Sequence, residues 1–84
     1  MLYRIFIEDK NHDELEKLIA KHFDGFTLLK GDGFWRAQKE GSLIIEIVTE
    51  DTEAKINKLA QDIKALNKQE AVLIQKIKNE QWLI

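Results

Sequence analysis

The residues best suited to ligand chemistry gather in a glycine-rich segment between positions 24 and 41. All four glycines of the chain fall there, and proline is absent throughout. Glycine is common where a backbone turns, bulges or lets another group approach closely, so we expect an irregular backbone around Gly31 and Gly33. Trp35 and Arg36 follow at once, and these residue types stack on planar ligands and bind anions. The predicted ligand-binding residues are Lys30, Gly31, Gly33, Trp35, Arg36 and Lys39.

Each of these residues also has a purely structural interpretation. Trp35 could fill a subunit interface, where aromatic residues are common, and charges that flank a turn, such as Arg36 and Lys39, are usually solvated. The segment Lys30-Gly31-Asp32-Gly33 could cradle a phosphate on its backbone amides or form a simple strand bulge. Strand alternation places Trp35 and Arg36 on opposite faces. A pocket that uses both therefore needs a bulge or a second subunit.

Patterns for catalysis and metal binding are missing from the sequence. Cysteine is absent, which excludes thiolate catalysis and zinc sites of the cysteine type. The two histidines, His12 and His22, are ten residues apart on one predicted helix, and neither has a second histidine four positions on. We expect His12 to be solvated and His22 to be a semi-buried packing residue, without a buried histidine–carboxylate pair. The sequence thus predicts no catalytic residue, no metal site and no cofactor.

Length and composition indicate one small domain, residues 1–84. The absence of cysteine makes a cytoplasmic setting the simpler assumption. Residues 1–8 are too short and too charged for a signal peptide or a membrane span. Lys plus Arg total 13 against 15 for Asp plus Glu, without a basic block, which argues against a duplex nucleic acid as partner. A core this small is marginal by itself, so the chain gains from associating.

Hydrophobic periodicity predicts the first half of the fold. Residues 2–8 alternate and are rich in aromatic and β-branched types, which indicates a strand. A helix follows, with Asn11 as its cap and Glu14 completing a capping-box-like pattern. Gly25 is placed to close this helix in the left-handed conformation.

The second half continues with strands and one more helix. Residues 26–38 indicate a strand that is broken at residues 31–33, and residues 39–41 look like a hairpin turn. Residues 42–49 form the most apolar strand, which we place in the sheet centre. Asp51 or Thr52 caps the second helix, and residues 70–78 form the last strand. The order β-α-β-β-α-β predicts an α+β, ferredoxin-like fold, with one antiparallel sheet and two helices on one face.

One face of such a sheet is left uncovered. Alternation assigns to this face Arg4, Phe6, Ser42, Ile44, Glu46 and Val48. Half of these are large and apolar, more than a solvated face normally carries, and Trp82-Leu83-Ile84 adds apolar surface beyond the last strand. Contiguous exposed apolar surface usually marks an interface. We therefore predict a homo-oligomer whose interface includes Phe6, Ile44, Val48 and Trp82.

Two resemblances to known proteins extend this interpretation. The stretch from Gly31-Asp32-Gly33-Phe34-Trp35-Arg36 through Leu43-Ile44-Ile45-Glu46-Ile47, the second helix and Gln69-Glu70-Ala71-Val72-Leu73-Ile74 resembles the CutA and PII-like trimeric proteins. The pattern at residues 24–27 and 33–36 is similar to short uncharacterised proteins of low-GC Gram-positive bacteria and their phages. The first resemblance implies a trimer with nucleotides or small anions bound between subunits. The long flexible loop of signalling PII proteins and a copper-type cluster are absent, which argues against adenylate sensing and metal binding.

Three classes of function follow from these observations. The first hypothesis is a non-catalytic homo-oligomer, with a trimer favoured, that holds a small anionic metabolite or nucleotide in intersubunit clefts. In a phage it would sequester a nucleotide immune signal and so inhibit anti-phage defence. The alternative is a protein-interaction module that inhibits or adapts a host protein through the open sheet face and Trp82. An enzyme that acts by positioning alone, for example a phosphodiesterase, is the third.

Overall fold

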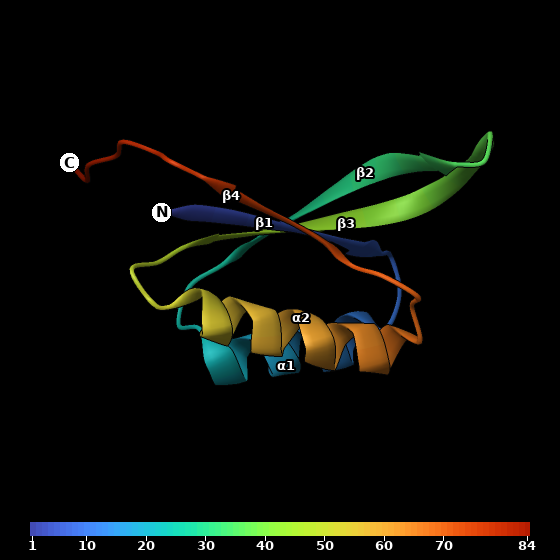
Figure 1. Cartoon of the computed structure of the whole chain (residues 1–84), viewed down its shortest axis with the longest axis horizontal. Helices are drawn as coiled ribbons and strands as arrows, with labels where there is room; N and C mark the ends of the chain where they lie inside the picture. Colours follow the sequence, from blue (N-terminus) through green and yellow to red (C-terminus); the bar gives the residue numbers. More distant parts are fainter.

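The computed structural model describes all residues from Met1 to Ile84. Six elements follow one another along the chain: β1 (Leu2–Glu8), α1 (His12–His22), β2 (Thr27–Trp35), β3 (Gln38–Val48), α2 (Glu53–Asn67) and β4 (Leu73–Ile77). Figure 1 shows a layer of strands above a layer that contains both helices. The predicted α+β, ferredoxin-like arrangement with both helices on one face is confirmed.

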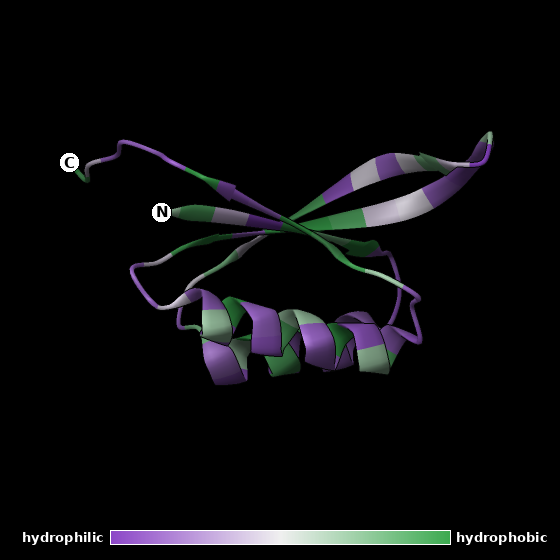
Figure 2. Ribbon diagram, in the orientation of Figure 1, coloured by the Kyte–Doolittle hydropathy of each residue, from purple (hydrophilic) through white to green (hydrophobic).

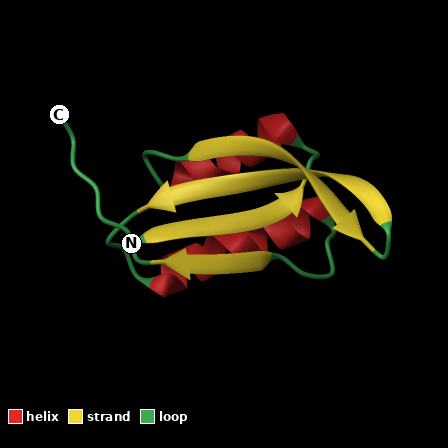
Figure 3. Cartoon of the chain, turned by 90° about the horizontal axis from the view of Figure 1, so that it is seen from above, coloured by secondary structure: helices red, strands yellow, loops and turns green.

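The four strands form one sheet in the order β2-β3-β1-β4, and every neighbouring pair is antiparallel. The two central strands are therefore β3 and β1, in agreement with the central position predicted for the most apolar strand. Figure 3 looks onto the face of the sheet that the helices leave free. We call this side the open face.

Strict alternation along β1 and β3 builds the core. Every second residue of β1, and of β3 from Leu43 onward, is buried between the sheet and the helices, and the intervening residues point to the open face. The buried hydrophobic cluster consists of Tyr3, Ile5, Ile7, Leu15, Ile19, Phe23, Leu43, Ile45, Ile47, Ile56, Leu59 and Ile63. Figure 2 shows hydrophilic stretches on the helices next to hydrophobic ones, as expected for helices with one apolar stripe.

The β2–β3 hairpin turns at a different place from the one predicted. Its two turn residues are Arg36 and Ala37, with φ angles of 51° and 62°, and Trp35 pairs with Gln38 across them. Positive φ at both central residues defines a type I′ turn, which fits the twist of a hairpin but usually contains asparagine or glycine. The predicted turn at residues 39–41 is wrong because those residues extend β3.

The glycines are also less irregular than predicted. No glycine has a positive φ, and β2 continues from Thr27 to Trp35 without a break at Gly31 or Gly33. The predicted bulge or nest is therefore wrong. Gly25 does not close α1 in the left-handed conformation, since extended Phe23 ends that helix instead.

Two non-glycine residues take the left-handed conformation at the helix ends. Asn11 precedes α1 with a φ of 57°, and its side chain makes no capping hydrogen bond, so the predicted capping box with Glu14 is wrong. Lys68 closes α2 with a φ of 54°. Thr52 precedes α2 as expected, without a side-chain cap. The last strand is shorter than predicted, Leu73–Ile77 in place of residues 70–78.

The helices are too short or too polar to cross a bilayer. Neither α1 nor α2 combines the length and the hydropathy that a membrane span requires.

Candidate functional site

The β2–β3 hairpin projects beyond the body of the molecule. Along β3 toward the hairpin turn, pairing with β1 ends at Ser42, which lies opposite Glu8. Residues 32–41 therefore form a two-stranded ribbon without a third strand, and we call it the arm. Figure 1 shows the arm extending past the ends of both helices, away from the chain termini. Most of the predicted ligand-binding residues lie on this arm or at its root.

Arg36 and Trp35 meet at the tip of the arm. The guanidinium carbon of Arg36 lies 5.6 Å from the centroid of the Trp35 ring, within the range of a cation–π contact. The prediction that alternation keeps these residues apart is wrong because Arg36 belongs to the turn. Trp35 and its neighbour Phe34 are 64% and 71% exposed. Arg36 makes no ion pair or side-chain hydrogen bond within the chain, so its donors are free for an anion.

The two predicted lysines lie elsewhere on the hairpin. Lys39 Nζ is 3.6 Å from Asp32 Oδ2, on the face of the ribbon opposite to that of Trp35. Lys30 lies at the root of the arm, across from buried Leu43. One subunit thus brings together Trp35 and Arg36 but does not bring the two lysines into the same pocket.

Gly31 and Gly33 face the same side as Trp35. A methyl group added to Gly31 would meet nothing within 4 Å, and one added to Gly33 would make only ordinary contacts, the nearest at 3.4 Å to Ser42 Cβ. Neither glycine is required by the backbone conformation or by crowding within one chain. Together they leave the main chain of β2 bare on its open-face side, at the root of the arm and within it.

Asp9 fixes the root of the arm to the body. Its backbone N–H donates to the carbonyl oxygen of Gly41 at 3.2 Å, and a methyl group on Gly41 would come within 3.2 Å of Asp9 Cβ. The carboxylate of Asp9 also pairs with the ring of His12. The hydrogen bond from His12 is the main cause that lowers the pKa of Asp9. His12, predicted to be solvated, keeps a partly exposed ring and in addition pairs with Asp9.

The open face carries a row of apolar side chains that crosses the whole sheet. Leu29 lies opposite Ile44, Ile44 opposite Phe6, and Phe6 opposite Leu73. We call these four residues the apolar row. Leu29 and Leu73, at the two edges, are 42% and 58% exposed. Phe6 and Ile44, which were predicted to lie on this face, form its centre.

A second apolar strip lies nearer the chain termini, and an ion pair separates the two. Leu2 lies opposite Val48 on one side and Ile77 on the other. Between this strip and the apolar row, Arg4 Nε donates to Glu46 Oε2 at 2.7 Å. The two charges neutralise each other, so the open face has almost no net charge at its centre.

A histidine–carboxylate pair that the sequence did not reveal joins the two helices. His22 Nε2 lies 3.2 Å from Asp62 Oδ2, and Lys58 Nζ donates to the other oxygen at 2.9 Å. These contacts lower the pKa of Asp62, with the Lys58 hydrogen bond as the largest cause. His22 also borders a polar cavity of about 250 Å³. Its predicted role as a purely packing residue is incomplete, because its partner comes from 40 residues along the chain.

Two of the charges that line that cavity, Lys55 and Asp51, are already paired with each other. Lys55 Nζ is 3.0 Å from Asp51 Oδ2 and 4.7 Å from the centroid of the Phe23 ring. No group of three or more His, Asp or Glu side chains in the molecule is arranged to hold a metal ion. The exposed, unpaired groups of the arm are therefore better placed to meet a ligand than the cavity is.

No protein-family model matches the chain, and no curated protein matches its sequence. A DUF3240 family protein from Shewanella baltica OS155 superposes with a TM-score of 0.71 at 18% identity, over 99% of this chain and 94% of that one. The divalent cation tolerance protein CutA from Archaeoglobus fulgidus, described as periplasmic, gives a TM-score of 0.52 at 18% identity, over 99% and 88%. The fold is CutA-like.

A further solved structure that matches the fold of this chain is described as a phage SAM lyase in its apo state. It matches with a TM-score of 0.69 at 19% identity, over 87% of this chain and 75% of that one. The predicted resemblance to CutA and PII-like proteins is confirmed for the fold. At identities below 20%, a shared fold leaves the activity to be argued from the site.

Proposed function

We propose that the chain forms a homo-oligomer, with a trimer favoured, that binds a small anionic metabolite or nucleotide in clefts between its subunits. The observation that carries this proposal is the arm, with unpaired Arg36 beside exposed Trp35 at its tip. In the single chain these two groups lie at the outer end of a projecting hairpin. A cleft around them is completed by a second subunit.

The exposed aromatic rings of the arm support an oligomer. A two-stranded ribbon is marginally stable in water by itself, yet this arm carries Phe34 and Trp35 in exposed positions. Packing against a neighbouring subunit would bury these rings, and an aromatic side chain buries roughly 150–250 Å². The apolar row and Val48 on the open face give a second surface that association would remove from water.

The chemistry of the arm supports an anionic, ring-bearing ligand. A guanidinium binds phosphate or carboxylate through paired N–H donors. The Trp35 ring offers a plane on which a base could stack, and bare backbone at Gly31 and Gly33 permits close approach. Lys30 of another subunit would add a point charge. These contacts fit a nucleotide or a comparable metabolite better than an uncharged ligand.

The structural neighbours give a choice of probes. One is described as a SAM lyase and another as a divalent cation tolerance protein, so this fold accommodates different activities. S-adenosylmethionine combines an adenosine with a carboxylate, which makes it a useful probe beside ATP and a cyclic dinucleotide. For a phage protein, we propose sequestration of a nucleotide immune signal as the purpose of such binding.

Native mass spectrometry of the purified protein tests this proposal, because it gives the stoichiometry and any retained ligand together. We expect a trimer that carries additional mass at up to one ligand per cleft, either retained or after adding one of the three probes. An unliganded monomer at micromolar concentration with all probes would overturn it. Conversion of a bound probe into products of different mass would indicate an enzyme.

The open face supports a second candidate, a protein-interaction module that inhibits or adapts a host protein. The observation in its favour is the apolar row, whose outer members Leu29 and Leu73 are half exposed. Ile44→Lys separates the two candidates. If the wild type is an oligomer and this variant is a folded monomer, the face is a self-interface. If the wild type is already a monomer that binds a host protein, and Ile44→Lys abolishes that binding, the alternative is supported. Ala65→Lys, on the exposed side of α2, is the matched control.

A further inference from the structure

The most exposed apolar side chains of the molecule lie after β4. Trp82 is 80% exposed, and Leu83 and Ile84 are fully exposed. We call these three residues the apolar tail. Figure 1 shows the chain leaving the sheet after β4 at the end opposite the arm, and Figure 3 shows it running away from the strands. Figure 2 shows that its last residues are hydrophobic. The apolar tail thus contacts neither its own core nor its own apolar row.

An unpaired polar atom lies at the base of this segment. The Oδ1 atom of Asn79 is buried and has no hydrogen-bond partner, while its Nδ2 donates to Gln81 Oε1 at 2.8 Å. A buried acceptor without a donor destabilises a folded protein. A donor from another molecule packed against this segment would remove that penalty.

We propose that the apolar tail of one copy covers the open face of a second copy, with Trp82 packed on Phe6 and Ile44. The inference rests on the proposed homo-oligomer and names the segment that seals its interface. Both surfaces are apolar, and each belongs to every copy. One tail and one face per chain match in any closed ring, a trimer included.

Charge favours a second copy as the occupant. The charges at the centre of the open face, Arg4 and Glu46, neutralise each other, and Lys78 and Glu80 balance in the segment that leads to the tail. A surface with a strong charge of one sign would repel its own copy and attract an oppositely charged partner. These two surfaces have no such charge, so they suit self-association.

Tryptophan fluorescence tests the proposal directly. The chain has two tryptophans, so Trp35→Phe leaves Trp82 as the only reporter. We expect its emission to be shifted to the blue at concentrations where native mass spectrometry finds the oligomer. On dilution to the monomer, the emission should move to the red. Blue emission that persists in the monomer would mean that the tail folds onto its own face, and red emission in the oligomer would mean that the tail is free. Either result overturns the proposal.

A mixing experiment assigns the contact to two different chains. In the Trp35→Phe background, Ile44→Lys should keep Trp82 emission red because its face is damaged. Adding an equal amount of Trp35→Phe/Trp82→Ala, which has an intact face and no tryptophan, should restore the blue shift. Absence of any shift on mixing contradicts the proposal. Val48→Lys, at a position that is already 46% exposed, replaces Ile44→Lys if circular dichroism shows that the latter is unfolded.

The failure of this inference differs from the failure of the proposed function. If the wild-type protein is a monomer at all concentrations, the proposed homo-oligomer is wrong, and the tail contact with it. If the protein is an oligomer in which Trp82 is fully exposed, and Trp82→Ala leaves its native mass unchanged, only the proposed tail contact is wrong.

Discussion

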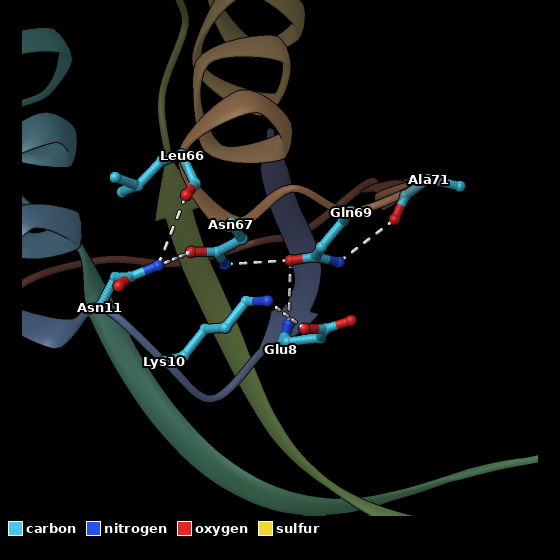
Figure 4. Close-up of polar contacts among 7 residues, drawn as sticks. All are labelled: Glu8, Lys10, Asn11, Leu66, Asn67, Gln69 and Ala71. Carbon is cyan, nitrogen blue, oxygen red and sulfur yellow. Dashed lines mark hydrogen bonds and ion pairs between the residues drawn. The ribbon is translucent and has the colours of Figure 1, made fainter.

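Asn11, which precedes α1, and Asn67, the last residue of α2, are joined side chain to side chain. Asn11 Nδ2 donates to Asn67 Oδ1 at 3.0 Å, and Asn67 is only 1% exposed. Figure 4 shows how this bond continues into a chain of polar contacts. Asn67 Nδ2 donates to Gln69 Oε1 at 3.0 Å, and the backbone N–H of Glu8 donates to that same oxygen at 3.1 Å. The end of β1, the start of α1 and the end of α2 are thereby fixed to one another.

Asn67→Ala is expected to destabilise the protein. The substitution removes the two hydrogen bonds to Asn11 and Gln69 at a partly buried site, and each such bond typically contributes about 0.5–1.5 kcal/mol. The measurement is the free energy of unfolding from urea titration followed by circular dichroism. Asn57→Ala, on the exposed side of α2, is the control and should change stability little or raise it slightly, since alanine favours helices. Equal stability of Asn67→Ala and wild type would show that the network carries no net free energy.

Ala37→Gly is expected to stabilise the protein. Ala37 has a φ of 62°, and this conformation costs a non-glycine residue about 1–2 kcal/mol. Glycine avoids that cost but adds unfolded-state entropy, so a net gain of about 0.5–1 kcal/mol is expected. Thermal unfolding measures it. Ala20→Gly, inside α1, should have the opposite sign, because glycine is unfavourable in a helix. A lower melting temperature for Ala37→Gly would show that the turn does not have these angles in solution.

Acid is expected to unfold the protein partly through Asp9 and Asp62. In the folded chain the pKa of each carboxyl is lowered from its ordinary value, because His12 hydrogen-bonds to Asp9 and Lys58 to Asp62. A carboxyl with a depressed folded pKa stabilises the fold above its unfolded pKa, and this stabilisation disappears as the pH falls through the folded value. Stability should therefore decrease below about pH 4.

The test of this pH dependence is the urea midpoint between neutral and acidic pH. Asp9→Asn should be less stable than wild type at neutral pH, and its midpoint should fall less steeply with acid. The control variant Asp13→Asn changes an exposed carboxyl of α1 that makes no ion pair or hydrogen bond, so its slope should match that of the wild type. A wild-type slope in Asp9→Asn would mean that the pair with His12 makes no contribution.

Arg36→Ala is expected to weaken anion binding and leave the assembly intact. A hydrogen bond to a charged group typically contributes about 1.5–3 kcal/mol, which corresponds to roughly a tenfold to hundredfold loss of affinity. Isothermal titration with the probe that the wild type binds measures this loss. Lys21→Ala removes an exposed cation of α1 and should keep the wild-type affinity. Unchanged affinity in Arg36→Ala would remove Arg36 from the site.

Much of the fold follows from local patterns in the sequence. Ile5 and Ile7 alternate with Arg4 and Phe6, and this period of two assigns the strand and both of its faces. The same argument identified Ile44 as a residue of the open face. Such patterns are readable because the chain must bury one side of each element, whatever its neighbours are.

The position of the hairpin turn could not be read in this way. Arg36 and Ala37 lack the asparagine or glycine that marks a type I′ turn, whereas Gly41 looked like a turn residue and lies in a strand beside Asp9. The register between β2 and β3 fixes the turn, through pairs that run from Thr27–Glu46 to Trp35–Gln38. Once this register aligns the strands, the two residues left between them must turn, even in an unfavourable conformation.

The polar contacts were decided by tertiary structure alone. His22 and Asp62 are 40 residues apart, and Asn11 and Asn67 are 56 apart, so no local spacing connects either pair. Asn11 looked like a helix cap because that role depends only on nearby residues. Packing of α1 beside α2 instead gave its side chain a partner on the other helix. Hydrophobic periodicity thus determined which elements form, and their packing determined which polar side chains meet, because a hydrogen bond depends on the positions of both partners in space.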